Sequence, residues 1–149
     1  MPQLIDRKWR GMNNGTQLGD YLNLDQAEIV WTAYPVDLLA TGQTSIIPVQ
    51  PAGNRFIPTR VVIELTAVTG ALGAPIVRLG NNGTWDNIAP LATLTGLNTQ
   101  YETISIPLNT PVNSIDLSAT AISFDVQTAG TVATIATASV YLIGILRLI

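Results

Sequence analysis

The strongest structural signal in the chain is an alternation of apolar and polar side chains between Arg60 and Val68. Val61, Ile63, Leu65 and Ala67 share one parity, and Arg60, Glu64 and Thr66 occupy the other. A period of two with β-branched residues is typical of a strand with one buried face, whereas a helix would scatter these apolar positions around its circumference. We therefore predict a strand here, with Pro58 at its start, where a missing N–H is tolerated.

Similar patterns predict further short strands, separated by Gly, Asn and Pro turns. These strands cover residues 29–34, 44–49, 76–79, 85–89, 101–108, 115–117 and 121–127. In the last of them, we expect Ile122, Phe124 and Val126 to face the core and Ser123, Asp125 and Gln127 to face solvent. Residues 36–40 fit either a continuation of the first strand or a turn of helix. Residues 90–98 are predicted to form an apolar link with one helical turn.

Residues 131–149 form the longest apolar run, and neither parity of this run is polar. A membrane span of about 20 apolar residues is disfavoured by the interspersed Thr and Ser residues, by Arg147 and by abundant β-branching, so we predict a long buried strand. A strand that is apolar on both faces needs cover on both. One cover is the domain core, and the other is an N-terminal arm or a neighbouring subunit. The predicted subunit interface consists of Val140, Tyr141, Leu142, Ile143 and Leu146.

The first 28 residues differ from the rest, because they are rich in charge and show no sustained strand or helix period. One alternative is a solvated terminus, but disordered segments are poor in aromatic residues, and Trp9 and Tyr21 lie here. We therefore predict an extended N-terminal arm over residues 1–28 that lies along a partner, followed by a β-sandwich domain over residues 29–149. The predicted partner-binding residues of the arm are Leu4, Ile5, Arg7, Lys8, Trp9, Arg10, Tyr21 and Leu22.

The composition limits the chemistry open to the chain. It contains no Cys and no His, which excludes Ser-His-acid and Cys-based catalysis and removes the commonest transition-metal ligand. Carboxylates such as Glu64 and Asp125 fall at outward strand positions and are expected to be solvated. Asn81, Asn82, Asp86 and Asn87 offer oxygens for calcium, but without the acidic cluster of known calcium loops. We therefore expect no enzyme activity, no cofactor and no metal.

The charge content indicates the surroundings of the protein. The charged fraction is 11%, under half of the roughly 25% of an ordinary domain. Such a surface is weakly solvated and suits a protein that lies against other subunits. The net charge of −3 gives no drive towards nucleic acid, and no apolar signal-peptide core follows the N-terminus. We expect neither a nucleic-acid partner nor a membrane.

About eight short strands with little helix predict an all-β fold. Eight strands suit a jelly-roll-like antiparallel β-sandwich, in which two Greek keys lie face to face. An immunoglobulin-like sandwich of six or seven strands is the alternative.

The segment from Pro48 to Ile63, which reads PVQPAGNRFIPTRVVI, resembles small β-sandwich structural proteins of tailed bacteriophages. The shared features are a polar N-terminal arm, a proline-punctuated start of a core strand and a terminal strand rich in Thr, Ala and Val. This family includes capsid decoration, or cement, proteins, which commonly form trimers on the outer shell. The resemblance implies a virion protein on the outer capsid surface that binds the major capsid protein and stabilises the assembled shell.

A second function remains open from the residues themselves. A carbohydrate- or receptor-binding domain of a phage fibre or tail would use Trp85 and Asp86, together with the Asn81-Asn82 turn, as an exposed stacking platform.

Overall fold

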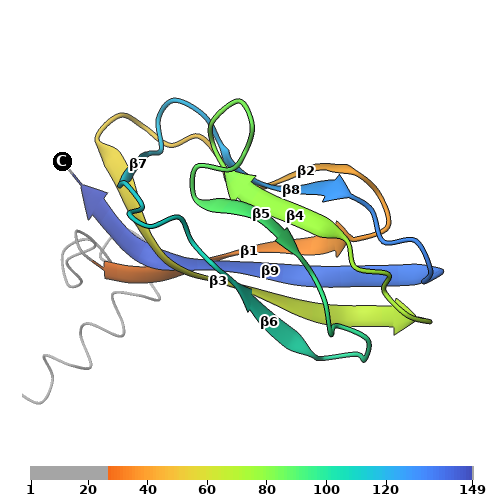
Figure 1. The fold of residues 1–149 in the computed structure, drawn as a ribbon. Helices are drawn as coiled ribbons and strands as arrows, with labels where there is room; N and C mark the ends of the chain where they lie inside the picture. Colours follow the sequence, from red (N-terminus) through yellow and green to blue (C-terminus); the bar gives the residue numbers. More distant parts are fainter. Residues whose placement is uncertain (1–26, 149) are drawn as a thin grey trace, which may run out of the picture.

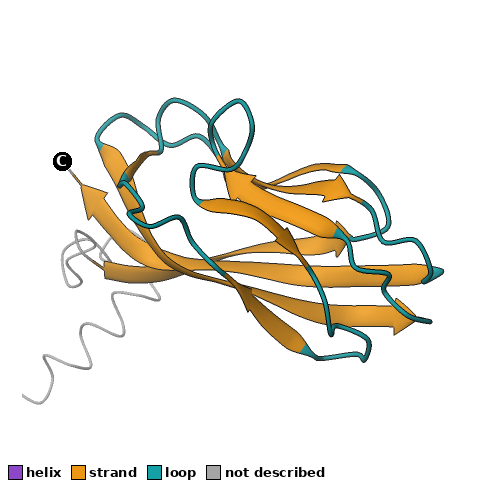
Figure 2. Ribbon diagram, viewed as in Figure 1, coloured by secondary structure: helices purple, strands orange, loops and turns teal. Residues whose placement is uncertain are grey.

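The computed structural model describes residues 27–148, which fold into nine β-strands with no helix (Figures 1 and 2). The strands are β1 (Ala27–Asp37), β2 (Gly42–Ile47), β3 (Asn54–Thr69), β4 (Ile76–Gly80), β5 (Ala89–Thr93), β6 (Thr103–Ile106), β7 (Ile115–Asp116), β8 (Ile122–Thr128) and β9 (Ile135–Leu148). They form a five-stranded sheet in the order β1-β9-β3-β6, with β7 also paired to β3, and a four-stranded sheet in the order β2-β8-β4-β5.

The strand pairing is that of a jelly roll. β4 pairs with β5, β3 with β6, β2 with β8 and β1 with β9, all antiparallel. Along the chain, each of these pairs encloses the one before it, as in a single long hairpin. Successive pairs belong alternately to the two sheets. A hairpin ribbon folded over itself in this way gives two face-to-face sheets. The predicted all-β jelly-roll-like sandwich is therefore confirmed for the described part of the chain.

The core lies between the two sheets and is supplied by one parity of each strand. Val61, Ile63 and Leu65 of β3 are 0% exposed, as are Phe124 and Ile122 of β8. The strand predicted at residues 60–68 is confirmed, but β3 begins six residues earlier, at Asn54. Pro58 thus lies within the strand and not at its start. It is tolerated because the register between β3 and β9 shifts between Pro58 and Arg60, and a bulge removes the need for a ladder N–H.

The structure decides two further predictions about the strands. β1 runs through Pro35 to Asp37, with a register shift between Ala33 and Val36, so residues 36 and 37 continue the first strand, which is one of the two alternatives that the sequence left open. The strand that returns from β4 is β5, at Ala89–Thr93, so the predicted strand at residues 85–89 is wrong. Residues 90–93 of the predicted link belong to β5, whereas residues 94–98 form a connection without a helical turn. Pro90 is compatible with a strand because β5 lies at the edge of its sheet.

The long apolar run near the C-terminus forms β9, the strand between β1 and β3. Within residues 27–148 there is no helix long and apolar enough to cross a membrane. Gly144 lies opposite Pro58 in β3, where a Cβ atom would collide with the Ile57 carbonyl oxygen and the Phe56 ring. Only glycine allows the two strands to approach at this point.

Candidate functional site

The outer face of the five-stranded sheet carries a band of apolar side chains, which we call the apolar stripe. It consists of Val30, Ile57, Val62, Tyr141, Ile143 and Ile145. The register places these residues beside one another: Val30 lies opposite Ile143 across β1 and β9, and Val62 lies opposite Tyr141 across β3 and β9. Val30 is 56% exposed. The other five are partly exposed, so within residues 27–148 no further layer of the chain covers the stripe.

Charged residues of both signs border the apolar stripe. Arg60 lies opposite Ile143, Glu28 opposite Ile145, and Glu64 opposite Ser139. The Tyr141 hydroxyl donates a 3.1 Å hydrogen bond to Oε1 of Glu64, which fixes the ring on the outer face. Because acidic and basic groups both lie here, this face has no strong preference for an acidic or a basic partner.

The predicted subunit interface divides between two faces of β9. Tyr141 and Ile143 belong to the apolar stripe, and their role stays a prediction. Val140 and Leu142 are 0% exposed in the core, and Leu146 packs against that core. The prediction that these three contact a neighbouring subunit therefore needs correction, because their side chains lie on the face that meets the other sheet. Both parities of β9 are apolar, so the sequence could not show which one faces inward.

The predicted arm residues, Leu4, Ile5, Arg7, Lys8, Trp9, Arg10, Tyr21 and Leu22, lie outside the described residues. Their role stays a prediction.

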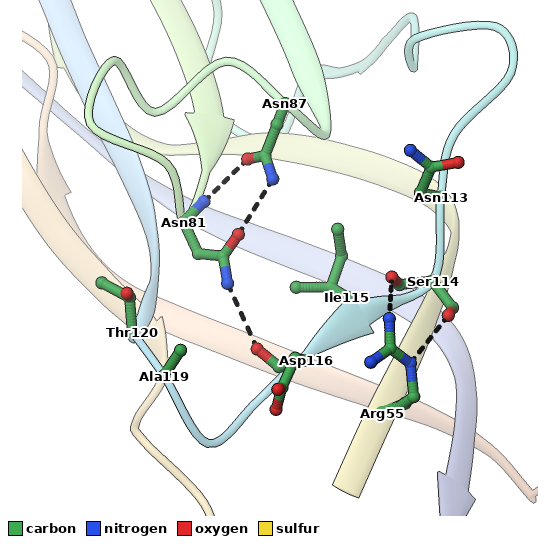
Figure 3. A pocket seen from close by; sticks show the side chains of 9 residues that line it. All are labelled: Arg55, Asn81, Asn87, Asn113, Ser114, Ile115, Asp116, Ala119 and Thr120. Carbon is green, nitrogen blue, oxygen red and sulfur yellow. Dashed lines mark hydrogen bonds between the residues drawn. The ribbon is translucent and has the colours of Figure 1, made fainter.

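A polar hollow of about 620 Å³ opens at the end of the sandwich where β7 pairs with the start of β3. It is lined by Arg55, Asn81, Asn87, Asn113, Ser114, Ile115, Asp116, Ala119 and Thr120. Figure 3 shows these residues arranged around Ile115. They come from β3, from the loop between β4 and β5, and from the segment around β7. Sequence reasoning missed this hollow because its residues lie far apart in the chain; the only signal was the density of Asn, Ser and Asp residues in the separate loops.

Hydrogen bonds fix the walls of the hollow (Figure 3). The Asn81 backbone N–H donates to Oδ1 of Asn87 at 2.9 Å, and Nδ2 of Asn87 donates back to Oδ1 of Asn81 at 2.9 Å. On the other wall, Arg55 donates from Nε to the Ser114 hydroxyl at 2.9 Å and from Nη2 to the Ser114 carbonyl at 2.8 Å. Hydrogen bonds from the Ser118 backbone N–H and hydroxyl, with a smaller contribution from Arg55, hold the pKa of Asp116 below its ordinary value.

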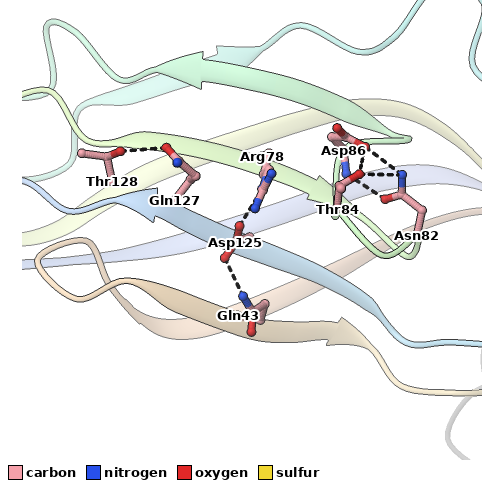
Figure 4. Close-up of polar contacts among 8 residues, drawn as sticks. All are labelled: Gln43, Arg78, Asn82, Thr84, Asp86, Asp125, Gln127 and Thr128. Carbon is pink, nitrogen blue, oxygen red and sulfur yellow. Dashed lines mark hydrogen bonds and ion pairs between the residues drawn. The ribbon is translucent and has the colours of Figure 1, made fainter.

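Asp125 forms a second polar cluster, on the outer face of the four-stranded sheet (Figure 4). Its Oδ2 accepts a 2.6 Å hydrogen bond from Nε of Arg78 on β4, and its Oδ1 accepts one of 2.9 Å from Nε2 of Gln43 on β2. Asp125 is only 2% exposed, so the prediction that it is solvated is wrong. Its outward parity on β8 is as expected, but the side chains of the two neighbouring strands cover it.

The loop around Asp86 satisfies its own polar groups. The Asp86 carboxylate accepts hydrogen bonds from Nδ2 of Asn82 at 2.7 Å and from the Thr84 hydroxyl at 2.6 Å (Figure 4), which hold the Asp86 pKa below its ordinary value. Trp85 is half-buried. Two of the groups predicted to form an exposed stacking platform are therefore partly buried or hydrogen-bonded within the loop.

Over residues 27–148, no group of three or more acidic, His or Cys side chains could hold a metal ion. No protein-family model matches the chain, and no curated protein matches it either. The apolar stripe and the polar hollow are thus the two surfaces from which a function can be argued.

Proposed function

We propose that the chain is a virion structural protein that decorates an assembled capsid shell as a homo-oligomer, in the manner of a cement protein. The observation that carries this proposal is the apolar stripe, which needs cover that the single chain does not supply among its described residues. A second copy of the chain is the occupant that the charges favour. Arg60 of one copy has Glu28 and Glu64 of another as complementary partners.

The low charge content of the chain supports the same proposal. With charged residues at 11%, few ionic groups must be desolvated when this surface is buried. Burial of a Val or Ile side chain is worth about 1.5–3 kcal/mol at full burial, and the stripe residues gain a part of this because they are already partly covered. The sum offsets association costs only if several stripe residues are buried together, so the proposed contact between copies covers the stripe as a whole. The trimer is what the resemblance to capsid decoration proteins implies.

The arm has a separate role in this proposal. Residues 1–28 combine cationic, aromatic and aliphatic side chains, a combination that suits contact with the major capsid protein on the outer shell surface. A protein that binds only the assembled shell stabilises that shell by mass action. Decoration would therefore raise the temperature at which the shell comes apart.

The experiment uses capsids of the encoding virus that were assembled without this chain. The full chain is expected to co-sediment with them and to raise their disruption temperature. A variant that lacks residues 1–26 keeps every described strand, so it should remain folded and oligomeric but no longer co-sediment. Failure of the full chain to bind capsids would contradict the decoration role, and unchanged binding of the shortened variant would contradict the role of the arm.

A further inference from the structure

The polar hollow has the features of a preformed binding site. Its volume of about 620 Å³ is large enough for a small molecule, although the hollow is open to solvent and does not enclose a ligand. Its two walls are held by the Asn81–Asn87 pair and by the two hydrogen bonds from Arg55 to Ser114. Nδ2 of Asn81 also donates a 3.3 Å hydrogen bond to the Asp116 carbonyl, which links the β4–β5 loop to β7. A ligand would meet groups that are already in place.

The backbone is shaped to keep the Asn81–Asn87 wall in position. A Cβ atom at Gly80 would collide with Oδ1 of Asn87, so the residue before Asn81 must be glycine for this pair to form. Asn109, which follows β6, holds the β4–β5 loop in place through two hydrogen bonds. Its Nδ2 donates to the Asp86 carbonyl at 2.7 Å, and its backbone N–H donates to the Ile88 carbonyl at 2.9 Å.

Several polar groups of the hollow have no hydrogen-bond partner within residues 27–148. They are Nη1 of Arg55, the Asn113 amide, Oδ2 of Asp116 and the Thr120 hydroxyl. The guanidinium only donates, the carboxylate only accepts, and the amide and hydroxyl do both. Arg55 and Asp116 lie directly opposite each other across β3 and β7, so a donor and an acceptor of opposite charge stand side by side.

We infer that the hollow binds a hydroxyl-rich ligand of the carbohydrate class. Each hydroxyl of a sugar both donates and accepts a hydrogen bond, and neighbouring hydroxyls can therefore satisfy Arg55, Asn113 and Asp116 together. An anion such as phosphate is disfavoured by the Asp116 carboxylate, and a metal cation is disfavoured by the Arg55 guanidinium. No aromatic side chain among residues 27–148 lines the hollow, so binding depends on hydrogen bonds exchanged with water and is weak.

This inference is independent of the proposed capsid role, because the hollow and the apolar stripe share no residue. It also differs from a stacking platform at Trp85, which does not line the hollow. A sugar bound here is recognised by the pattern of its hydroxyl groups and not by the face of its ring.

The test is a titration of the ¹⁵N-labelled full chain, followed by NMR chemical shifts. The probes are methyl α-mannopyranoside, methyl β-galactopyranoside and N-acetylglucosamine, with inorganic phosphate and Ca²⁺ titrated separately. At least one sugar is expected to shift the amide signals of residues 81–87 and 113–120 in fast exchange. Asn113→Ala removes an exposed side chain that has no hydrogen-bond partner among the described residues, so it should preserve the fold and weaken this binding several-fold. Asp116→Asn should weaken it further.

Asn98→Ala is the matched control, because Asn98 is an exposed residue of the loop between β5 and β6 and does not line the hollow. It should leave the titration unchanged. The inference is overturned if no sugar shifts the residues of the hollow, if only phosphate or Ca²⁺ does so, or if Asn113→Ala and Asp116→Asn bind the sugar as well as the unmodified chain.

Discussion

Asp125 joins three strands through one carboxylate. Its two oxygens are hydrogen-bonded to Arg78 on β4 and to Gln43 on β2, on either side of β8 (Figure 4). The two members of the ion pair differ in exposure: the Arg78 side chain is 20% exposed and the Asp125 side chain 3%. A buried charge that loses its partner is costly, whereas a partly exposed charge can turn to water.

This difference predicts an unequal response to truncation of the pair. Arg78→Ala should lower the free energy of unfolding by up to about 3 kcal/mol, because the carboxylate loses its charged partner and keeps only the hydrogen bond from Gln43. Asp125→Ala should lower it by less, since the guanidinium can reach solvent. The double variant should be no less stable than Arg78→Ala. Urea unfolding followed by tryptophan fluorescence measures all three. Gln127→Ala changes an exposed residue of the same strand and serves as the control, because it should alter the free energy of unfolding by no more than about 0.5 kcal/mol. A larger loss of stability for Asp125→Ala than for Arg78→Ala would contradict the argument.

Sequence patterns predicted the burial of individual residues well where that burial depends only on the alternation within one strand. The parities of Val61, Ile63 and Leu65 followed from alternation alone, and all three are buried. Asp125 has the predicted parity but not the predicted exposure, because its burial depends on Gln43 and Arg78, which lie far away in the chain. The residues of the polar hollow were missed for the same reason. Which strands are neighbours is a property of the fold, and single-strand patterns do not contain it.

Among the connecting segments, the loop between β5 and β6 depends on one carboxylate. Oε2 of Glu102 accepts hydrogen bonds from the backbone N–H groups of Asn98 at 2.6 Å and Thr99 at 2.9 Å. These bonds favour the ionised form and hold the Glu102 pKa below its ordinary value of 4.5. The Tyr101 N–H in turn donates to the Leu65 carbonyl at 2.6 Å, so the loop is tied to the core strand β3.

The lowered pKa predicts how the stability of this loop depends on pH. Between the unfolded and folded pKa values the unfolded chain binds more protons, so stability falls as the solution becomes more acidic. The contribution of Glu102 is complete above about pH 4.5 and is lost as the pH falls through the lower folded value. Glu102→Gln should therefore lower the thermal unfolding midpoint at neutral pH and converge with the unmodified chain at the acidic end.

Thermal unfolding of both proteins over a series of pH values measures this convergence. Asn98→Ala provides the control, because the side chain of Asn98 takes no part in the loop bonds and its effect should not change with pH. A constant difference between Glu102→Gln and the unmodified chain at every pH would contradict the assigned role of the carboxylate.

The elements that sequence patterns misjudged are those in which local signals and tertiary pairing disagree. Residues 90–93 contain a proline and were predicted to belong to a link, yet they form most of β5. The proline is tolerated because β5 pairs only with β4 and lies at the edge of its sheet. β9 was predicted as a buried strand, and it is. The ambiguity over its two apolar faces was resolved only by pairing with β1 and β3, which turns Val140 inward and Tyr141 outward.

At the scale of the whole molecule, the nested pairing of the jelly roll accounts for both candidate surfaces. Wrapping the ribbon buries one face of each sheet and brings the β4–β5 loop beside β7, where the polar hollow forms. It leaves the outer face of the five-stranded sheet without a covering layer among the described residues. That face is apolar along its centre and carries charges of both signs around it, so charges of opposite sign would meet in the proposed contact between copies.

The proposed oligomer is a trimer, as the resemblance to capsid decoration proteins implies, and its contact runs through the apolar stripe. The unmodified chain should then have three times the monomer mass by light scattering, and Val30→Lys and Ile143→Lys should each reduce it to the monomer. The two residues lie opposite each other on the outer face, where a buried lysine would be desolvated without a partner. Because neither side chain lies in the core, the thermal unfolding midpoint of the monomeric variants should report a folded chain.

Leu91→Lys is the matched control for these variants. Leu91 is 54% exposed, close to the 56% of Val30, but it lies on β5 of the other sheet. It introduces the same charge at an equally exposed aliphatic position, so it should leave the oligomer intact. Dissociation by Leu91→Lys as well would mean that added charge alone separates the subunits, and a monomeric unmodified chain would mean that something other than a second copy covers the apolar stripe. Only selective dissociation by the changes at residues 30 and 143 identifies this face as the subunit contact.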